Sequence, residues 1–234
     1  MVQFTATRWS QLLAAFWIVM LLLPLACGVE RAALGGTDRI VFLGDSITEL
    51  GVKPNGYVTI LKDSLTARYP GIAVLGAGIS GNKVTNLQER LDRDVISKKP
   101  TLVVIYIGIN DVWHFLLNGN GTPKDKFEAG LRDVIGRVQN AGARVILCTP
   151  SVVGEKHNGD NKLDAQLDEY SDISRRVAKE LGVKLCDLRK AFIDYLTTHN
   201  PDNKDRGILT VDSVHLNDDG NRFVAAVMLE CLEK

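Results

Sequence analysis

From Arg39 onward, short runs rich in β-branched residues alternate with longer amphipathic segments, and this alternation constrains the fold more than any other feature. The sequence predicts five strands, at 40–43, 72–75, 102–107, 144–148 and 183–186. It predicts helices between and after them, at 57–68, 84–97, 125–140, 163–181, 188–197 and 218–232. Because repeated strand-to-helix steps build parallel crossovers, we expect a parallel sheet covered by helices on both faces.

The composition is that of one globular domain without a charge bias. The chain has 234 residues, of which 45% are hydrophobic and 24% are charged, so it can bury one sizeable core. Lysine plus arginine number 28 and aspartate plus glutamate also number 28, so no net charge attracts nucleic acid or acidic lipid. We therefore expect a local site and no nucleic-acid partner.

The first part of the chain differs in character from the rest. Arg8 precedes an uncharged apolar stretch at 12–26, which is typical of an export signal and is shorter than the roughly 20 apolar residues of a membrane span. We assign 1–35 to a signal peptide or N-terminal anchor with a short linker, and 36–234 to one folded domain. We expect an exported protein that is periplasmic, secreted or attached to a membrane only through this segment.

The cysteines bear on targeting and on cross-linking. Leu25-Ala26-Cys27 resembles the end of a bacterial lipoprotein signal, so lipidation of Cys27 stays open beside simple cleavage. Cys148, Cys186 and Cys231 lie in apolar surroundings, and an odd number without close spacing argues against a zinc site or a disulfide framework. We predict that these three are buried free thiols.

Polar clusters follow several predicted strands at their carboxyl ends. Gly44-Asp45-Ser46 follows the first strand, a glycine-rich turn at 76–82 follows the second, and Gly108-Ile109-Asn110-Asp111 follows the third. Asp212-Ser213-Val214-His215 comes after the last strand and its helix. Because ligands bind at the carboxyl ends of parallel strands, we expect one crevice lined by all four clusters.

Three residues in these clusters can form a serine nucleophile with its base. A serine hydroxyl needs a base to take its proton and a third group to orient that base. Ser46 lies where a strand gives way to a loop that leads to a helix, and Asp212 precedes His215 by three residues. That spacing brings the carboxylate and the imidazole to the same side of the chain. We predict a catalytic triad of Ser46, His215 and Asp212.

Donors for a developing oxyanion are also present. The predicted donors are the backbone N–H of Gly81, the side-chain amide of Asn110 and the N–H of Ser46. Glycine permits close backbone approach, and an amide donates without carrying a charge. The arrangement predicts acyl transfer that needs no metal and no cofactor.

The four clusters, in this order and strand context, resemble the sequence blocks of the SGNH subgroup of GDSL hydrolases, from Arg39 to the C-terminus. The first block reads Gly-Asp-Ser-Ile where the family has Gly-Asp-Ser-Leu, which exchanges one apolar residue for another. The resemblance implies a three-layer α/β/α, flavodoxin-like sandwich with a five-stranded parallel sheet in the order 2-1-3-4-5. It also implies hydrolysis of carboxylic esters through an acyl-enzyme on Ser46, with short acyl esters, acetylated carbohydrates and lysophospholipids as candidate substrates.

Two other functions stay open at this point. The first is a metal-dependent phosphoesterase, for which the potential ligands are Asp45, Asn110, Asp111, His114, Asp212 and His215. The sequence lacks the Asp-x-His and Gly-Asn-His pairs that are typical of such sites. The second is a non-catalytic, flavodoxin-like module that binds a ligand in the same crevice.

Several polar residues beside the clusters receive other interpretations. We expect Asp45 and Asp111 to support loop geometry rather than to transfer protons. Ser80 is set aside as a rival nucleophile because its surroundings lack the final glycine of a Gly-x-Ser-x-Gly elbow. His157 and His199 lie in polar segments, and we expect both to be solvated.

The segment after the third cluster carries candidate substrate-pocket residues. Trp113, His114 and Phe115 are the predicted members, and Leu116 and Leu117 extend an apolar wall for an acyl or alcohol group. The apolar members are equally compatible with a place in the core. His114 is compatible with a pocket residue or a metal ligand.

Overall fold

The computed structural model describes residues 1–3 and 33–233, and the chain divides into two units, Met1–Ala32 and Ala33–Lys234. The apolar stretch at 12–26 and Cys27 lie outside the described residues. The predicted leader and its lipidation therefore stay predictions. Within the described residues, no helix is both long and apolar enough to cross a membrane.

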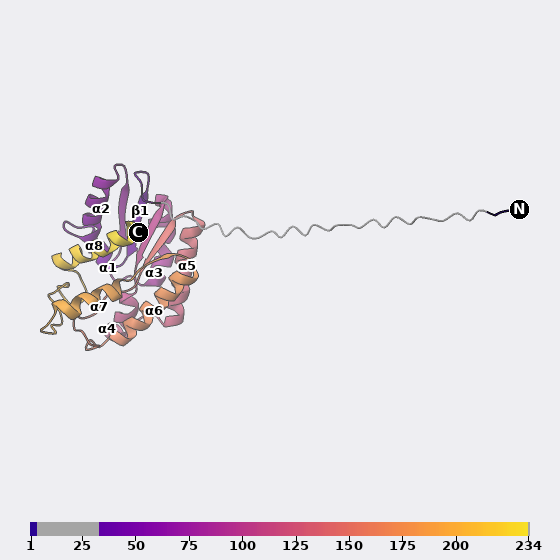
Figure 1. Cartoon of the computed structure of the whole chain (residues 1–234). Coiled ribbons are helices and arrows are strands. Elements are labelled where there is room, and N and C mark those ends of the chain that lie inside the picture. Colours follow the sequence, from indigo (N-terminus) through magenta and orange to yellow (C-terminus); the bar gives the residue numbers. More distant parts are fainter. Residues whose placement is uncertain (4–32, 234) are drawn as a thin grey trace. The chain divides into compact units, whose positions relative to one another are not determined.

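A five-stranded parallel sheet forms the centre of the second unit (Figure 1). Its strands are β1 (Arg39–Gly44), β2 (Ala73–Gly78), β3 (Leu102–Tyr106), β4 (Arg144–Cys148) and β5 (Lys184–Cys186). They pair in the order β2-β1-β3-β4-β5, which confirms the predicted topology. Strand β1 is buried from Ile40 to Gly44 and lies between β2 and β3, so the chain leaves an interior strand of the sheet at Gly44.

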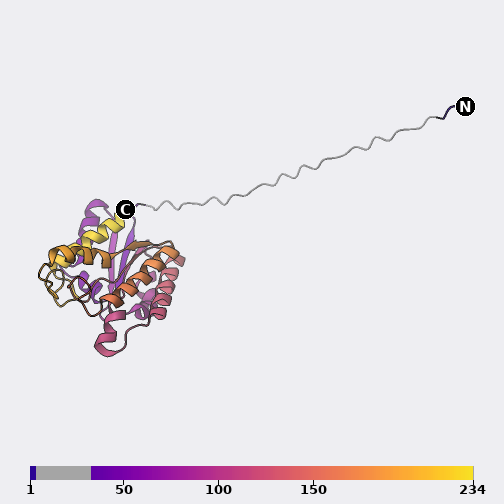
Figure 2. The same cartoon turned by 60° about the horizontal axis from the view of Figure 1, so that its bottom comes forward.

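Helices cover both faces of this sheet. They are α1 (Ser46–Gly51), α2 (Tyr57–Arg68), α3 (Val84–Asp94), α4 (Ile109–Asn118), α5 (Lys124–Asn140), α6 (Asp164–Glu180), α7 (Leu188–His199) and α8 (Asp218–Glu233), with a 3₁₀ turn at Ile96–Lys98. Helices α2, α7 and α8 pack together on one face, and α3, α5 and α6 pack together on the other (Figures 1 and 2). The predicted three-layer arrangement is therefore confirmed.

Two short helices were absent from the predicted set, and both begin at the predicted site. Helix α1 starts at Ser46 directly after β1, and α4 starts at Ile109 after β3. Strand β2 also runs to Gly78, into the glycine-rich turn. A side chain at Gly78 would place its Cβ 2.1 Å from the backbone nitrogen of Glu49, so glycine allows α1 to pack directly against β2.

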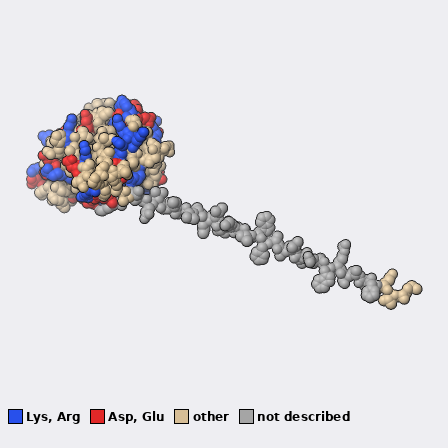
Figure 3. All heavy atoms as spheres, turned by 90° about the horizontal axis from the view of Figure 1, so that it is seen from above, with Lys and Arg blue, Asp and Glu red and all other residues tan. Residues whose placement is uncertain are grey.

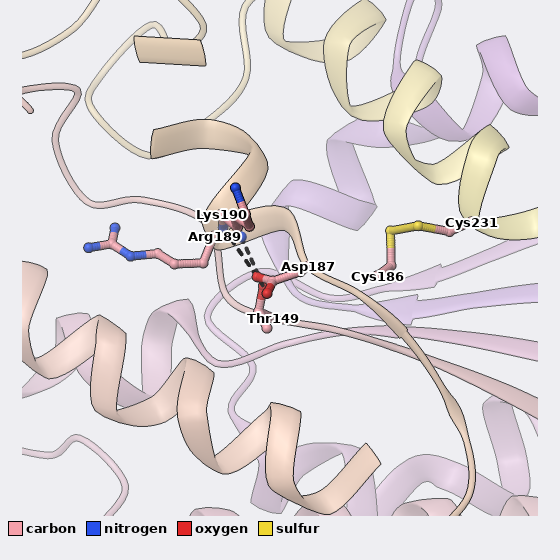
Figure 4. Close-up of a disulfide and its surroundings, with 6 residues drawn as sticks. All are labelled: Thr149, Cys186, Asp187, Arg189, Lys190 and Cys231. Atoms are coloured by element: carbon pink, nitrogen blue, oxygen red, sulfur yellow. Dashed lines mark hydrogen bonds between the residues drawn. A yellow bond between two sulfur atoms is a disulfide. The ribbon is translucent and has the colours of Figure 1, made fainter. Parts of the chain in front are cut away.

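The cysteine prediction is correct for Cys148 and wrong for the other two. Cys148 is a buried free thiol at the end of β4, and burial raises the pKa of its thiol. Cys186 in β5 forms a disulfide with Cys231 in α8, with 5.8 Å between their Cα atoms (Figure 4). The two residues are 45 positions apart in sequence and meet only because α8 packs against β5, which spacing alone does not reveal.

The surface carries both signs of charge. In Figure 3 lysine and arginine side chains and aspartate and glutamate side chains both appear on the face shown. This mixture accords with the equal totals of 28 basic and 28 acidic residues.

Candidate active site

Ser46 is the first residue of α1 and lies at the exit of β1. Asp45 caps this helix, because its carboxylate accepts a hydrogen bond from the N–H of Ile47 at 3.0 Å. A Cβ on Gly44 would approach the carbonyl oxygen of Tyr106 to 2.5 Å, so glycine lets the turn lie close to β3. Ser46 is 9% exposed, which leaves its hydroxyl at the edge of the sheet.

The structure brings Ser46, His215 and Asp212 into one hydrogen-bonded chain. The Nε2 atom of His215 lies 2.9 Å from the Oγ atom of Ser46. The Nδ1 atom of the same ring lies 2.7 Å from Oδ2 of Asp212. This is the geometry in which one ring nitrogen accepts the serine proton while the other donates to a carboxylate.

His215 and Asp212 lie in a segment without helix or strand, here named the acid–base loop (207–217). Thr210 and Leu216 form an isolated antiparallel bridge across it. Oδ1 of Asp212 accepts from the N–H of His215 at 2.8 Å, which turns the carboxylate toward the ring. Burial acts to raise the pKa of Asp212, but the hydrogen bonds from His215 outweigh it, so the pKa is lowered and the carboxylate stays ionised.

Besides the N–H of Ser46, the two other predicted oxyanion donors lie on segments that meet at the same edge. Gly81 follows β2 in a turn with φ of 75°, which glycine adopts without strain. Asn110 lies in the first turn of α4 and is 3% exposed. Its Nδ2 atom donates to the carbonyl of Asn82 at 3.1 Å, and an amide nitrogen carries a second hydrogen that can serve a ligand.

Arg90 is a structural residue of this edge that the sequence analysis missed. Its guanidinium is buried and donates to Oδ1 of Asn82 at 2.7 Å and to the carbonyl of Gly44 at 2.7 Å. These bonds join the Gly81 turn to the end of β1. A signal was available, because Arg90 falls on the buried face of α3 with Val84, Leu87 and Leu91, where a charge needs partners.

Glu49 on α1 holds the same turn from the other side. Its carboxylate accepts from the N–H of Ser80 at 2.6 Å and also from the Ser80 hydroxyl. These bonds lower the pKa of Glu49. The Ser80 hydroxyl is therefore bonded to the Glu49 carboxylate, whereas the imidazole of His215 bonds to Ser46.

Asp45 and Asp111 are buried beside the site and act on the backbone. Burial raises the pKa of Asp45 to about 7, the N–H of Ile47 opposes the rise, and the nearby Asp111 carboxylate adds to it. Burial likewise raises the pKa of Asp111 to about 6, and its carboxylate accepts from the N–H of Val84 at 3.1 Å. These contacts agree with the expected role in loop geometry.

The candidate pocket residues differ in burial. Trp113 is half-buried, and its ring packs edge-to-face against His215 at 6.4 Å between centroids. His114 is half-buried, and burial together with Lys83 lowers its pKa. Phe115 is 36% exposed, and Leu116 and Leu117 are each 55% exposed, so a place in the core is wrong for these three.

Of the two histidines expected to be solvated, one is exposed and the other is not. His157 is half-buried rather than solvated, with Nε2 3.1 Å from the carbonyl of Asn200, and its Nδ1 is buried without a hydrogen-bond partner among the described residues. His199 is exposed as expected but lies at the end of α7, stacked on Tyr195 at 3.9 Å. Neither ring reaches the acid–base loop through these contacts.

No group of three or more histidine, cysteine, aspartate or glutamate side chains within the described residues has the arrangement of a metal site. Five of the six potential ligands named from the sequence, all except His114, are instead bonded to backbone or to one another. Asp45 accepts from Ile47, Asp111 from Val84, and Asp212 bonds to His215.

Comparisons with known proteins identify relatives over most of the chain. A sequence profile of the GDSL-like Lipase/Acylhydrolase family matches residues 42–223. An acetylxylan esterase of Geobacillus stearothermophilus is 32% identical over 213 residues, which are 84% of this chain and 94% of that protein. An isoamyl acetate-hydrolyzing esterase 1 homolog of Mus musculus is 28% identical, over 88% of this chain and 86% of its own length.

A solved structure extends the likeness to three dimensions. The crystal structure of the acetyl xylan esterase AlAXEase matches with a TM-score of 0.81 at 45% identity, over 83% of this chain and 99% of that one. The matches support neither a metal-dependent phosphoesterase nor a non-catalytic module. The chain belongs to the GDSL-like lipase/acylhydrolase family and is a serine hydrolase of carboxylic esters.

Proposed function

We propose that the protein removes acetyl groups from acetylated carbohydrates, with Ser46 as nucleophile, His215 as general base and acid, and Asp212 as the group that orients His215. The observation that carries the assignment of roles is the continuous chain of contacts from Ser46 Oγ through His215 to Asp212, at 2.9 and 2.7 Å. Two hydrogen bonds in series match the requirement that the base be oriented while it accepts a proton.

In the proposed reaction, Ser46 Oγ attacks the ester carbonyl carbon while His215 Nε2 takes the serine proton. The bond to the alcohol oxygen then breaks, and the alcohol leaves with that proton. Water adds to the acetyl-enzyme as His215 accepts its proton, and acetate leaves as Ser46 regains its hydrogen. Donation from Asn110 and from the N–H groups of Gly81 and Ser46 stabilises the oxyanion in both halves.

The choice of an acetyl group is supported by two relatives with different alcohols. One is an acetylxylan esterase and the other is an isoamyl acetate-hydrolyzing esterase homolog, so the acetyl group is what their names share. Trp113 stands beside His215 and is the proposed wall for a small acyl group. A carbohydrate alcohol is favoured because the 45% identical structure is also that of an acetyl xylan esterase.

The test combines acyl-chain length with the alcohol. Wild-type protein should hydrolyse nitrophenyl acetate faster than the butyrate and octanoate, and should release acetate from acetylated xylan. Ser46→Ala should remove both activities while its circular dichroism spectrum stays that of the wild type, because one hydroxyl at the crevice edge adds little to packing. Full activity in Ser46→Ala would refute the nucleophile. A preference for octanoate would refute the acetyl pocket.

We also propose that the protein is exported, by way of the apolar segment at 12–26. The Cys186–Cys231 disulfide supports this, because such bonds persist in oxidising compartments and are rare in the cytosol. Mass spectrometry of the mature protein distinguishes a start near Gly28, a lipidated Cys27 and an intact Met1. Reduced cysteines together with an intact N-terminus in the cytosolic fraction would contradict export.

A further inference from the structure

Glu155 is a fully buried carboxylate that lies outside the proposed reaction. It follows β4, on the segment that leads to α6, and its exposed fraction is 0%. Its side chain accepts hydrogen bonds from three consecutive main-chain N–H groups. Oε2 accepts from the N–H of Ile208 at 2.7 Å. Oε1 accepts from the N–H of Leu209 at 2.6 Å and from that of Thr210 at 2.5 Å.

All three donors belong to the acid–base loop. Thr210 is two positions before Asp212, so the bonds end next to the residue that orients the base. The neighbouring Gly154 adds a fourth contact, because its N–H donates to the carbonyl of Ser213 at 2.8 Å. One short segment therefore holds the loop on both sides of Asp212.

The backbone of Glu155 is fixed as well. Its N–H donates to the carbonyl of Asp205 at 2.9 Å, and its own carbonyl accepts from the side chain of Asn200 at 2.9 Å. The main chain of Glu155, which we call the anchor of the loop, is thus fixed relative to the segment that follows α7. Charge-assisted bonds to a carboxylate are shorter and stronger than bonds between neutral groups, and these three have that character.

We propose that Glu155 is a positioning residue, whose carboxylate sets the acid–base loop so that His215 and Asp212 are aligned with Ser46. Glu155 touches none of the reacting atoms and acts only through the main chain of 208–210. The inference rests on the proposed roles of His215 and Asp212. Small displacements of a catalytic group cost large factors in rate, so loosening the anchor should slow the reaction.

Replacement of the carboxylate has a defined consequence. In Glu155→Gln one oxygen becomes an NH₂ group, which cannot accept from an N–H donor and leaves at least one loop amide unpaired. Glu155→Asp keeps the charge but is shorter by one methylene and cannot reach all three donors. Each variant weakens the hydrogen bonds to 208–210 and leaves the side chains of Ser46, His215 and Asp212 chemically unchanged.

Asp164 provides a matched control. It is also a buried carboxylate, at the start of α6, and it accepts from the N–H of Asn161 and pairs with Arg189 at 2.8 Å. None of these partners belongs to the acid–base loop. Asp164→Asn should therefore lower stability through a buried contact of the same chemical kind while leaving His215 in place.

The experiment compares kcat and KM for nitrophenyl acetate in the full chain, at a temperature where circular dichroism shows each variant folded. We expect Glu155→Gln to lower kcat by about 10- to 100-fold with KM changed by less than about threefold. We expect Asp164→Asn to keep kcat within about twofold. In wild-type protein, hydrogen exchange at the amides of 208–210 should be slow, and in Glu155→Gln it should accelerate.

Three results would overturn the inference. These are an unchanged kcat in Glu155→Gln, an equal loss of kcat in Asp164→Asn, or fast exchange at 208–210 in the wild type. Should the glutamine variant not fold, Glu155→Asp and the wild-type exchange rates give the same decision. The proposed function fails separately, when Ser46→Ala keeps full activity whatever Glu155 does.

Discussion

The nucleophile and its base are held in place in opposite ways. Ser46 lies at the end of a buried central strand, and the residue that caps its helix, Asp45, acts on an amide only two positions away. The acid–base loop has neither helix nor strand, and the carboxylate that anchors it is 53 to 55 positions distant in sequence. The Ser46 side is thus fixed by a strand of the sheet and a helix cap, whereas the acid–base loop depends on a carboxylate distant in sequence.

This difference predicts two kinds of defect. A change at the Ser46 turn should act on the chemical step alone, because the sheet keeps the backbone in place. A change in the acid–base loop or its anchor should act on alignment, because the loop backbone belongs to neither a helix nor a strand. The following predictions test that division, beginning with the largest effect.

The largest effect is expected from the loop itself. His215→Ala should lower kcat by about 10³-fold or more, because base and nucleophile act as one unit. Asp212→Asn should cost a similar or smaller factor, and the double variant should be no worse than His215→Ala. Steady-state kinetics on nitrophenyl acetate measures all three. If the fold-losses in kcat of the two single variants multiplied in the double variant, the two side chains would act independently. That result would contradict the account of the acid–base loop as one aligned unit.

Asn110 tests the part of the site that is held by the sheet. Asn110→Ala should lower kcat by roughly 10²-fold with a much smaller change in KM, because its amide serves the oxyanion more than the ground-state carbonyl. The variant should keep wild-type exchange rates in the acid–base loop, since Asn110 bonds to Asn82 and not to the loop. A change in KM alone would make Asn110 a binding residue instead.

Removal of the disulfide tests whether a covalent bond or the Glu155 carboxylate aligns the acid–base loop. The segment closed by Cys186 and Cys231 spans 45 positions and contains the acid–base loop. A closed loop of that length contributes about 4 kcal/mol by chain entropy, so Cys186→Ser should lower the free energy of unfolding in denaturant by up to that amount. Its kcat should stay within about twofold. A fall in kcat as large as that of Glu155→Gln would show that the bond, and not the carboxylate, aligns the loop.

The prediction for Asp45 concerns stability rather than rate, and the effect is seen only as a function of pH. Its pKa is raised from 3.8 to about 7, so the native state holds a proton that the unfolded state releases. Stability from this group is therefore complete below about pH 4 and is lost as pH rises to about 7. Asp45→Asn keeps an acceptor for Ile47 and removes the titration. Relative to wild type, its free energy of unfolding should rise over this range by an amount on the order of a few kcal/mol. A pH-independent difference would contradict the raised pKa.

The same division explains what could be predicted from the sequence. The strands and most helices follow from periodic apolar residues, and the polar clusters at 44–46 and 108–111 are recognisable because they directly follow strands. Helix α1 has only six residues, which is too short for a periodic apolar pattern, and the first turn of α4 carries Asn110 and Asp111, which are typical of a turn. The start of each helix is fixed by the strand that precedes it, β1 for α1 and β3 for α4.

The missed contacts are those between distant segments. Glu155 looks like an ordinary polar residue in a glycine-containing surface segment, and nothing near it in sequence indicates that 208–210 lie against it. The Cys186–Cys231 bond was missed for the same reason, since its partners meet through the packing of α8 on β5. Arg90 differs, because its place on the buried face of α3 was visible in the sequence pattern.

The most direct test of the account is the site of covalent labelling by an organophosphonate probe. Intact wild-type protein should take up one equivalent, and peptide mass spectrometry should place the adduct on Ser46. Labelling should be absent in Ser46→Ala and slow in His215→Ala. An adduct on Ser80 or elsewhere, or ester hydrolysis that continues in protein resistant to the probe, would contradict the assignment of Ser46 as the nucleophile.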